Sequence, residues 1–184
     1  MKNIFLIGDS IRLGYEATVI RELEGNCKVF SSPDNARFTT YTMRYVHEWM
    51  KDAPSIDLVH WNNGLWDSCH WNGDPISLVS LDSYVQNLLR IYGYIRRLCP
   101  NAKIIFALST PVDAQHPRIL NRELDAMNKA AVKTLDGLVD GFDDLSSIVK
   151  ANPGFIRTTD HVHLTDIGYE ELGKAVAQCI RKFL

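Results

Sequence analysis

The stretch Ile4-Phe5-Leu6-Ile7-Gly8-Asp9-Ser10 begins with four consecutive apolar residues and ends in a glycine, an acid and a serine. A short continuous apolar run that stops at a turn residue is typical of a strand buried on both faces, as in a parallel sheet. The stretch therefore predicts a core strand over 2–7, with Ser10 just beyond its carboxyl end.

The rest of the chain alternates between strand-like and helix-like segments. We expect further strands over 27–30, 56–61, 103–108 and 137–142. We expect helices over 12–23, 39–50, 81–98, 121–135, 145–150 and 165–183, with Thr165 as the cap of the last one and Leu13, Ala17, Ile20 and Leu23 along one apolar face of the first. This alternation predicts an α/β fold, a three-layer flavodoxin-like sandwich with a five-stranded parallel sheet, in a single domain over 1–184.

Composition excludes several classes of protein. A net charge of -2 over 184 residues gives no basis for binding nucleic acid or an anionic membrane. The four cysteines are widely scattered, which argues against a zinc or redox motif. We see no signal-peptide pattern and no apolar stretch long enough to cross a bilayer, so a cytoplasmic location is expected. The oligomeric state stays open.

Polar residues follow the predicted strands at the points where they end. Ser10 follows the first strand, Arg37 the second, Asn62 the third and Ser109 the fourth. Ligands of open parallel sheets bind beyond the carboxyl ends of the strands. Because a buried fold has no structural need for polar groups at every strand end, we expect one shared site there.

An acid and a histidine stand near the other end of the chain, in Asp160-His161-Val162-His163. Together with Ser10 they provide a hydroxyl, a base that can take its proton and a carboxylate that can orient the base. These are the groups that nucleophilic catalysis by serine requires.

Three blocks of this sequence, in order, resemble those of the SGNH hydrolases, also called GDSL esterases and lipases. They are Gly8-Asp9-Ser10-Ile11 after the first strand, Asn62-Asn63-Gly64-Leu65 after the third, and the Asp160 to His163 block near the last helix. Ser109-Thr110-Pro111-Val112 after the fourth strand is similar as well. A lone G-D-S would be weak, but three blocks in order on the expected elements are a specific signal.

The resemblance has two gaps. The second block of the family carries a glycine whose backbone N–H binds the oxyanion, and the corresponding stretch here, 34–39, contains none, with Arg37 in the glycine position. A backbone N–H survives that replacement if the local conformation is kept. In the third block, Trp61 stands where glycine is common and Asn63 where aspartate is.

The resemblance implies a role for each matching residue. Ser10 would be the nucleophile, His163 the general base and then the general acid, and Asp160 the group that orients the imidazole. The backbone N–H groups of Ser10 and Arg37, with the side-chain amide of Asn62, would form the oxyanion hole. The implied reaction is hydrolysis of a small carboxylic ester through an acyl-enzyme, with no metal and no organic cofactor.

A loop rich in tryptophan follows the third strand and is a candidate wall of the substrate pocket. Trp66 and Trp71 lie in it, and Trp61 and Arg12 stand beside it in the predicted fold. Aromatic faces stack well on sugars, and members of the family deacetylate carbohydrates, so an acetylated carbohydrate is one expected substrate. The same tryptophans could equally cover the edge of the sheet or an interface.

Two other functions use the same residues. Asp160, His161 and His163, joined by His60 or His70, could form the metal site of a phosphoesterase. The chain could also be a non-catalytic ligand-binding module, in which every candidate has an ordinary structural role. Ser10 would then cap a helix, Asp160 would be a turn residue and His163 would cap the last helix. Asn62 would form a turn, with Asn63 as the functional amide in its place, and Arg37 would be a solvated charge. The serine mechanism alone explains why all of them occur together and in order.

Overall fold

Strand β1 lies inside the sheet, paired in parallel with β2 on one side and β3 on the other. The computed structural model describes residues 1–184, and the sheet order is β2-β1-β3-β4-β5, with every pair parallel. The strands are β1 (Lys2–Ile7), β2 (Cys27–Ser31), β3 (Leu58–Trp61), β4 (Lys103–Ala107) and β5 (Gly141–Asp143). The expected five-stranded parallel sheet is therefore confirmed. The strand order reverses between β1 and β3, which is where such sheets bind ligands.

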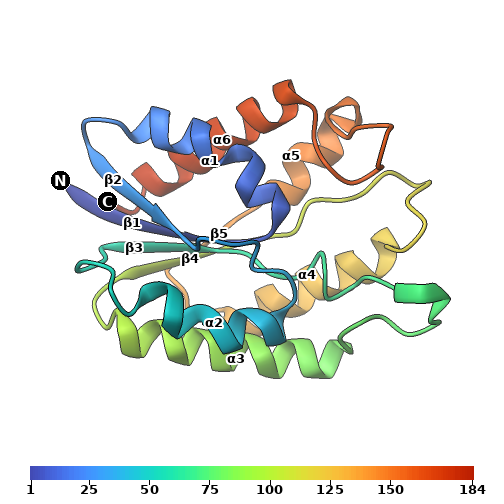
Figure 1. Cartoon of the computed structure of the whole chain (residues 1–184), viewed down its shortest axis with the longest axis horizontal. Helices are drawn as coiled ribbons and strands as arrows, with labels where there is room; N and C mark the ends of the chain where they lie inside the picture. Colours follow the sequence, from blue (N-terminus) through green and yellow to red (C-terminus); the bar gives the residue numbers. More distant parts are fainter.

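Six helices cover the two faces of the sheet (Figure 1). One layer holds α1 (Ser10–Leu23), α5 (Leu145–Ala151) and α6 (Asp166–Arg181); the other holds α2 (Thr39–Met50), α3 (Leu81–Leu98) and α4 (Asn121–Leu135). Successive side chains of a strand point to opposite faces, so Ile4 packs under the first layer and Phe5 under the second. This arrangement of α/β/α layers is the predicted three-layer sandwich.

Helices α1 and α6 pack closely through small residues. A Cβ atom on Gly14 would lie 2.1 Å from the ring of Tyr169, and one on Gly173 would lie 2.5 Å from Thr18 Cβ. The hydroxyl of Thr18 also donates a hydrogen bond of 3.0 Å to the Glu170 carboxylate. These contacts bring the start of the chain against its end.

Most predicted boundaries agree with the structure, and the largest difference is at the last strand. The segment expected to form a strand from 137 instead makes a turn in which Gly137 has a φ of +72°, and β5 begins only at Gly141. Helix α1 begins at Ser10 rather than at 12, because Asp9 caps it. Thr165 caps α6 as predicted, its hydroxyl accepting from the backbone N–H of Gly168.

The expected apolar face of α1 is buried only at its end, where Leu23 is 1% exposed. Leu13 and Ile20 are each 46% exposed, whereas Arg12, Tyr15 and Val19 are buried. The buried face of α1 carries the polar side chain of Arg12 as well as apolar ones, so the spacing of apolar residues alone does not identify this face. None of the helices is both long enough and apolar enough to span a lipid bilayer.

Candidate active site

Ser10 is the first residue of α1, at the carboxyl end of β1. The carboxylate of Asp9 caps the helix by accepting from the backbone N–H of Ile11 at 2.9 Å, so the expectation that Ser10 itself might serve only as the cap is wrong. Gly8 permits the tight turn, since a Cβ there would lie 2.6 Å from Arg12 Cβ. Because the first N–H groups of a helix have no intrahelical acceptor, the backbone N–H of Ser10 stays available.

Ser10, His163 and Asp160 form one chain of hydrogen-bonding contacts. His163 Nε2 lies 2.9 Å from Ser10 Oγ, and His163 Nδ1 lies 3.1 Å from Asp160 Oδ2. With Nδ1 protonated and donating to the carboxylate, Nε2 is free to accept the serine proton. The three residues thus stand in the order that proton transfer from the hydroxyl requires.

The turn that holds Asp160 also sets its charge. Asp160 Oδ1 accepts from the backbone N–H groups of Val162 at 3.0 Å and His163 at 2.8 Å, which closes the D-x-x-H segment into a compact turn. Burial on its own would raise the pKa of Asp160, but these two N–H groups and the imidazole lower it below its usual value. Asp160 is therefore a carboxylate at neutral pH, available to stabilise an imidazolium.

The second expected oxyanion donor is engaged elsewhere. Arg37 has a φ of +51°, the left-handed conformation that glycine adopts most easily, which agrees with its place in the glycine position. Its backbone N–H, however, donates to Asn35 Oδ1 at 2.8 Å. The conformation is kept but the donor is not free, so the expectation for Arg37 is corrected here.

The third expected donor is also occupied. The side-chain amide of Asn62 donates to the carbonyl of Ala107 at 2.8 Å and to the hydroxyl of Ser109 at 3.2 Å. Asn63, the alternative amide, donates to the carbonyl of Arg37 and to Thr42. Both asparagine amides thus donate to other protein groups in this structure. The backbone N–H of Ser10 is the only expected oxyanion donor that is left free.

A cavity of about 140 Å³ opens beside Ser10 and His163. The other residues that line it are mostly apolar and come from three loops: Leu65, Trp66, Cys69, Trp71, His116, Arg118, Ile119 and Val162. Trp66 and Trp71, which we expected in the wall of a substrate pocket, lie in this lining together with Ser10. Burial raises the pKa of the Cys69 thiol, so Cys69 stays protonated and does not compete with Ser10 as a nucleophile.

The other two residues expected in the pocket wall lie elsewhere. Trp61 is fully buried on the opposite face of the sheet, where its ring packs edge-on against Phe106 at 4.9 Å. Arg12 is 1% exposed, and its guanidinium binds Glu16 together with the carbonyls of Ser32 and Asp34. Arg12 therefore anchors the β2–α2 loop and cannot reach a substrate.

The three residues proposed for a metal site do not converge. His161 faces Asp113, with Nδ1 3.4 Å from Oδ1, while His163 faces Ser10. His60 is paired with Asp143 inside the fold at 3.0 Å, and His70 with Glu123 at 2.7 Å. The structure contains no group of three acidic, histidine or cysteine side chains placed to hold one metal ion.

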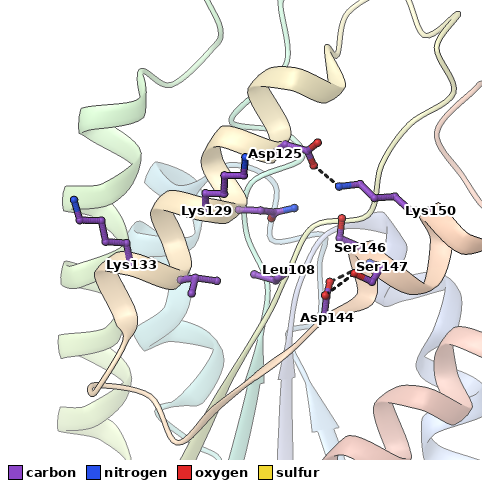
Figure 2. A pocket seen from close by; sticks show the side chains of 10 residues that line it. Leu108, Asp125, Lys129, Lys133, Asp144, Ser146, Ser147 and Lys150 are labelled. Carbon is purple, nitrogen blue, oxygen red and sulfur yellow. Dashed lines mark hydrogen bonds and ion pairs between the residues drawn. The ribbon is translucent and has the colours of Figure 1, made fainter.

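A larger hollow of about 540 Å³ lies between α4 and α5 (Figure 2). Lys129, Lys133 and Lys150 stand around it, with Lys150 neutralised by Asp125 at 2.6 Å. Asp144 caps α5 by accepting from Ser147. None of the predicted site residues lines this hollow, so we do not assign the chemistry to it.

Sequence reasoning missed two polar residues of the cavity beside Ser10, His116 and Arg118. Both lie in the loop between β4 and α4, directly after the polar strand end at Ser109. Their position beyond the carboxyl end of a central strand is a signal that could have found them. No local motif marks either residue.

Comparison with known proteins identifies the fold. No family model matches the sequence, and no curated protein matches it. Three solved structures are nevertheless similar over nearly the full length of both chains. A lipase/acylhydrolase from Enterococcus faecalis is 19% identical, with a TM-score of 0.81 and coverage of 99% of this chain and 96% of that one. An aryl esterase from M. smegmatis is 16% identical, with a TM-score of 0.79 and full coverage of both, 100% each.

An acetylxylan esterase from Geobacillus stearothermophilus is also similar, at 17% identity and a TM-score of 0.77, covering 96% of this chain and 93% of that one. At these identities the likeness concerns the fold. It agrees with the resemblance carried by the sequence blocks at Ser10, Asn62 and His163. The chain therefore has the α/β/α fold of these solved lipase/acylhydrolase, aryl esterase and acetylxylan esterase structures.

Proposed function

We propose that the chain is a serine esterase of the SGNH hydrolase family, which hydrolyses small carboxylic esters through an acyl-enzyme at Ser10. The observation that carries the proposal is the contact chain from Ser10 Oγ to His163 Nε2 and from His163 Nδ1 to Asp160. Serine, imidazole and carboxylate come from opposite ends of the sequence. Simple structural roles for each do not account for their alignment.

In the first step, Ser10 Oγ attacks the carbonyl carbon of the ester while His163 Nε2 takes the hydroxyl proton. The Asp160 carboxylate stabilises the imidazolium that forms. Collapse of the tetrahedral intermediate breaks the bond to the alcohol oxygen, which receives the proton from His163. The alcohol leaves, and the acyl group stays on Ser10.

In the second step, His163 takes a proton from water, and the resulting hydroxide attacks the acyl carbon. Return of the proton to Ser10 Oγ releases the carboxylic acid and restores the enzyme. The developing oxyanion is stabilised by the backbone N–H of Ser10 and by the amino end of α1, where the helix dipole favours negative charge.

The cavity supports a small ester as a whole, with a short acyl group and a small alcohol portion. Its volume is about 140 Å³. Leu65, Ile119 and Val162 give it apolar walls. We therefore expect acetyl and propionyl esters to be hydrolysed faster than esters of long fatty acids.

The test is a series of 4-nitrophenyl esters of increasing acyl length, assayed with the wild type and with Ser10→Ala. An organophosphonate should label the wild type by one adduct, located on Ser10 by mass spectrometry. His163→Asn should abolish turnover. The matched control is His161→Asn, in the other histidine of the H-x-H pair, which should leave turnover intact because His161 faces Asp113 and not Ser10. Ester hydrolysis by Ser10→Ala at the wild-type rate would contradict the proposal.

Treatment with a chelator distinguishes the serine mechanism from a metal-dependent phosphoesterase. Dialysis against a strong chelator should leave ester hydrolysis unchanged, since no step of the serine mechanism uses a metal ion. Loss of activity that returns with a divalent metal, together with faster turnover of a phosphate ester, would favour the metal site instead. Absence of labelling and of turnover on every ester would favour the non-catalytic module.

A further inference from the structure

His116 lines the same cavity as Ser10 and His163 and is 9% exposed. It lies in the loop between β4 and α4. That loop packs against the segment carrying the catalytic histidine, because the backbone N–H of Asp113 donates to the carbonyl of His161 at 2.9 Å. His116 is therefore held on the side of the cavity that adjoins His163.

The tautomer of His116 is set by its own loop. Its Nδ1 accepts from the backbone N–H of Ile119 at 2.9 Å and from that of Arg118 at 3.3 Å. A ring nitrogen that accepts hydrogen bonds carries no proton, so the proton of the neutral ring is on Nε2. Burial lowers the pKa of His116, and the nearby Arg118 lowers it further, so the ring is neutral at pH 7.

The Nε2–H of His116 is left without an acceptor in the protein. It makes no intramolecular hydrogen bond, yet it is not among the buried polar atoms that lack a partner, so it remains accessible. His116 is one of the residues that line the cavity beside Ser10. A neutral donor is therefore carried by the wall of a cavity whose other polar side chains include Ser10, His163 and Arg118.

The side of the cavity decides which part of the substrate this donor meets. In the proposed mechanism, His163 protonates the leaving alcohol, so groups beside His163 face the alcohol portion of the ester. The oxyanion instead forms at the amino end of α1, beside the backbone N–H of Ser10.

We propose that His116 binds the alcohol portion of the substrate, donating a hydrogen bond from Nε2 to a hydroxyl oxygen on it. The inference rests on the proposed esterase function and narrows its substrate class to short-chain acyl esters of polyhydroxy alcohols. A simple alkyl ester lacks this acceptor and makes no such hydrogen bond to the Nε2–H.

Two substrates of matched size test this idea: 1-acetylglycerol, which has two hydroxyl groups, and propyl acetate, which has none. The wild type should prefer the glycerol ester in kcat/KM, with the difference carried mainly by KM because the contact is present before the reaction. One hydrogen bond of this kind corresponds to a preference of roughly 3- to 10-fold.

Two substitutions separate substrate binding from loop structure. In His116→Asn, the amide oxygen can replace Nδ1 as acceptor for Ile119 while the donor at the Nε2 position is lost. In His116→Gln, the longer amide can carry a donor to the Nε2 position while the acceptor for the loop is lost. We expect His116→Asn to keep near-normal stability and lose the preference for the glycerol ester. We expect His116→Gln to be less stable and to keep part of that preference.

The opposite order, with the preference kept in His116→Asn and lost in His116→Gln, would overturn the inference and leave His116 a purely structural residue. Failure of the proposed esterase function has a different signature, namely no Ser10-dependent hydrolysis of either ester. A wild-type measurement covers the case in which the variants do not fold. ¹⁵N NMR of labelled histidine should show the Nε2–H tautomer for His116 and a shift of its resonance on addition of glycerol; an Nδ1–H tautomer or an unchanged resonance would refute the assignment.

Discussion

Asp67 caps α2 from another part of the chain: its Oδ1 accepts from both the backbone N–H of Thr39 at 2.9 Å and the Thr39 hydroxyl at 2.5 Å. Helix α2 has no capping side chain of its own, because Phe38 occupies the cap position. Asp67 directly follows Trp66, which lines the catalytic cavity. The capping carboxyl thus connects the cavity loop to the second helix layer.

We predict that Asp67 makes stability fall as pH rises from about 4 to about 7. Burial raises the pKa of Asp67 to about 7, so the folded protein holds this proton over a range in which the unfolded chain, with a pKa of about 3.9, has released it. The stabilisation is complete below pH 4 and is lost through pH 7. Each unit of pKa shift corresponds to ~1.4 kcal/mol. Urea unfolding of the wild type and Asp67→Asn across this range should show the difference between them shrinking with pH; a constant difference would contradict the prediction.

His70 should make the stability of the fold depend on pH in a higher pH range than Asp67 does. Its ring contacts two acceptors, Glu123 at 2.7 Å and the carbonyl of Asp74 at 2.9 Å, which raise its pKa and favour the imidazolium. Its stabilising effect is therefore full below pH 6.5 and is lost as pH rises through the raised pKa. The Tm advantage of the wild type over His70→Gln should be larger at pH 6 than at pH 9. Glu123→Gln should reduce that pH dependence too, and a pH-independent advantage would show that the ring is not charged.

Asp160→Asn should lower kcat by ~10⁴-fold, although it is the closest isostere. The backbone N–H groups of Val162 and His163 hold one side-chain oxygen, so the Asn NH₂ group would face His163 Nδ1. That arrangement forces the imidazole proton onto Nε2, which then cannot accept from Ser10. Asp160→Ala should be no more damaging than Asp160→Asn in steady-state assays. A mild effect of the Asn variant would show that the carboxylate does not set the tautomer.

Arg37→Gly should be more stable than Arg37→Ala by about 1 kcal/mol. Both changes remove the guanidinium that stacks on Tyr41 at 4.7 Å, so the pair differs only at the backbone. A side chain at a φ of +51° is strained, and glycine removes this strain from the folded state. Glycine also raises the conformational entropy of the unfolded chain, which offsets part of the gain in stability. Equal urea midpoints would mean that the loop relaxes in the alanine variant.

Asn62→Ala should act mainly on stability, lowering the free energy of unfolding by ~1–3 kcal/mol. Removing the amide leaves the carbonyl of Ala107 and the hydroxyl of Ser109 without their donor. Thermal unfolding and kcat should be measured on the same preparation. A variant of normal stability with turnover reduced by ~10²–10³-fold would instead assign the amide to the oxyanion.

The sequence predicted what depends on short-range order. The β1 boundaries and the turn from Asp160 to His163 follow from residues that are neighbours in the chain. The oxyanion donors could not be predicted in the same way. Whether the amide of Asn62 or the N–H of Arg37 is free depends on partners brought in by folding, such as Ala107 for Asn62.

Tryptophan placement shows the same limit. Trp61 and Trp66 are five positions apart, yet the first faces the core of the second helix layer and the second faces the catalytic cavity. Which way each ring points is decided by the end of β3 and the turn after it. There, Gly64 has a φ of +143°, and a Cβ on it would lie 2.7 Å from Ser109 Oγ.

The close packing of Gly14 against Tyr169 implies an order of events when the protein unfolds. Ser10, the proposed nucleophile, lies on the first helix, and His163, the proposed base, lies just before the last, so the distance between them depends on α6 staying docked on α1. Fraying of the chain terminus would separate Ser10 from His163 while the five strands were still paired. Loss of hydrolysis in mild denaturant should therefore precede the change in far-ultraviolet circular dichroism, making turnover an early reporter of partial unfolding.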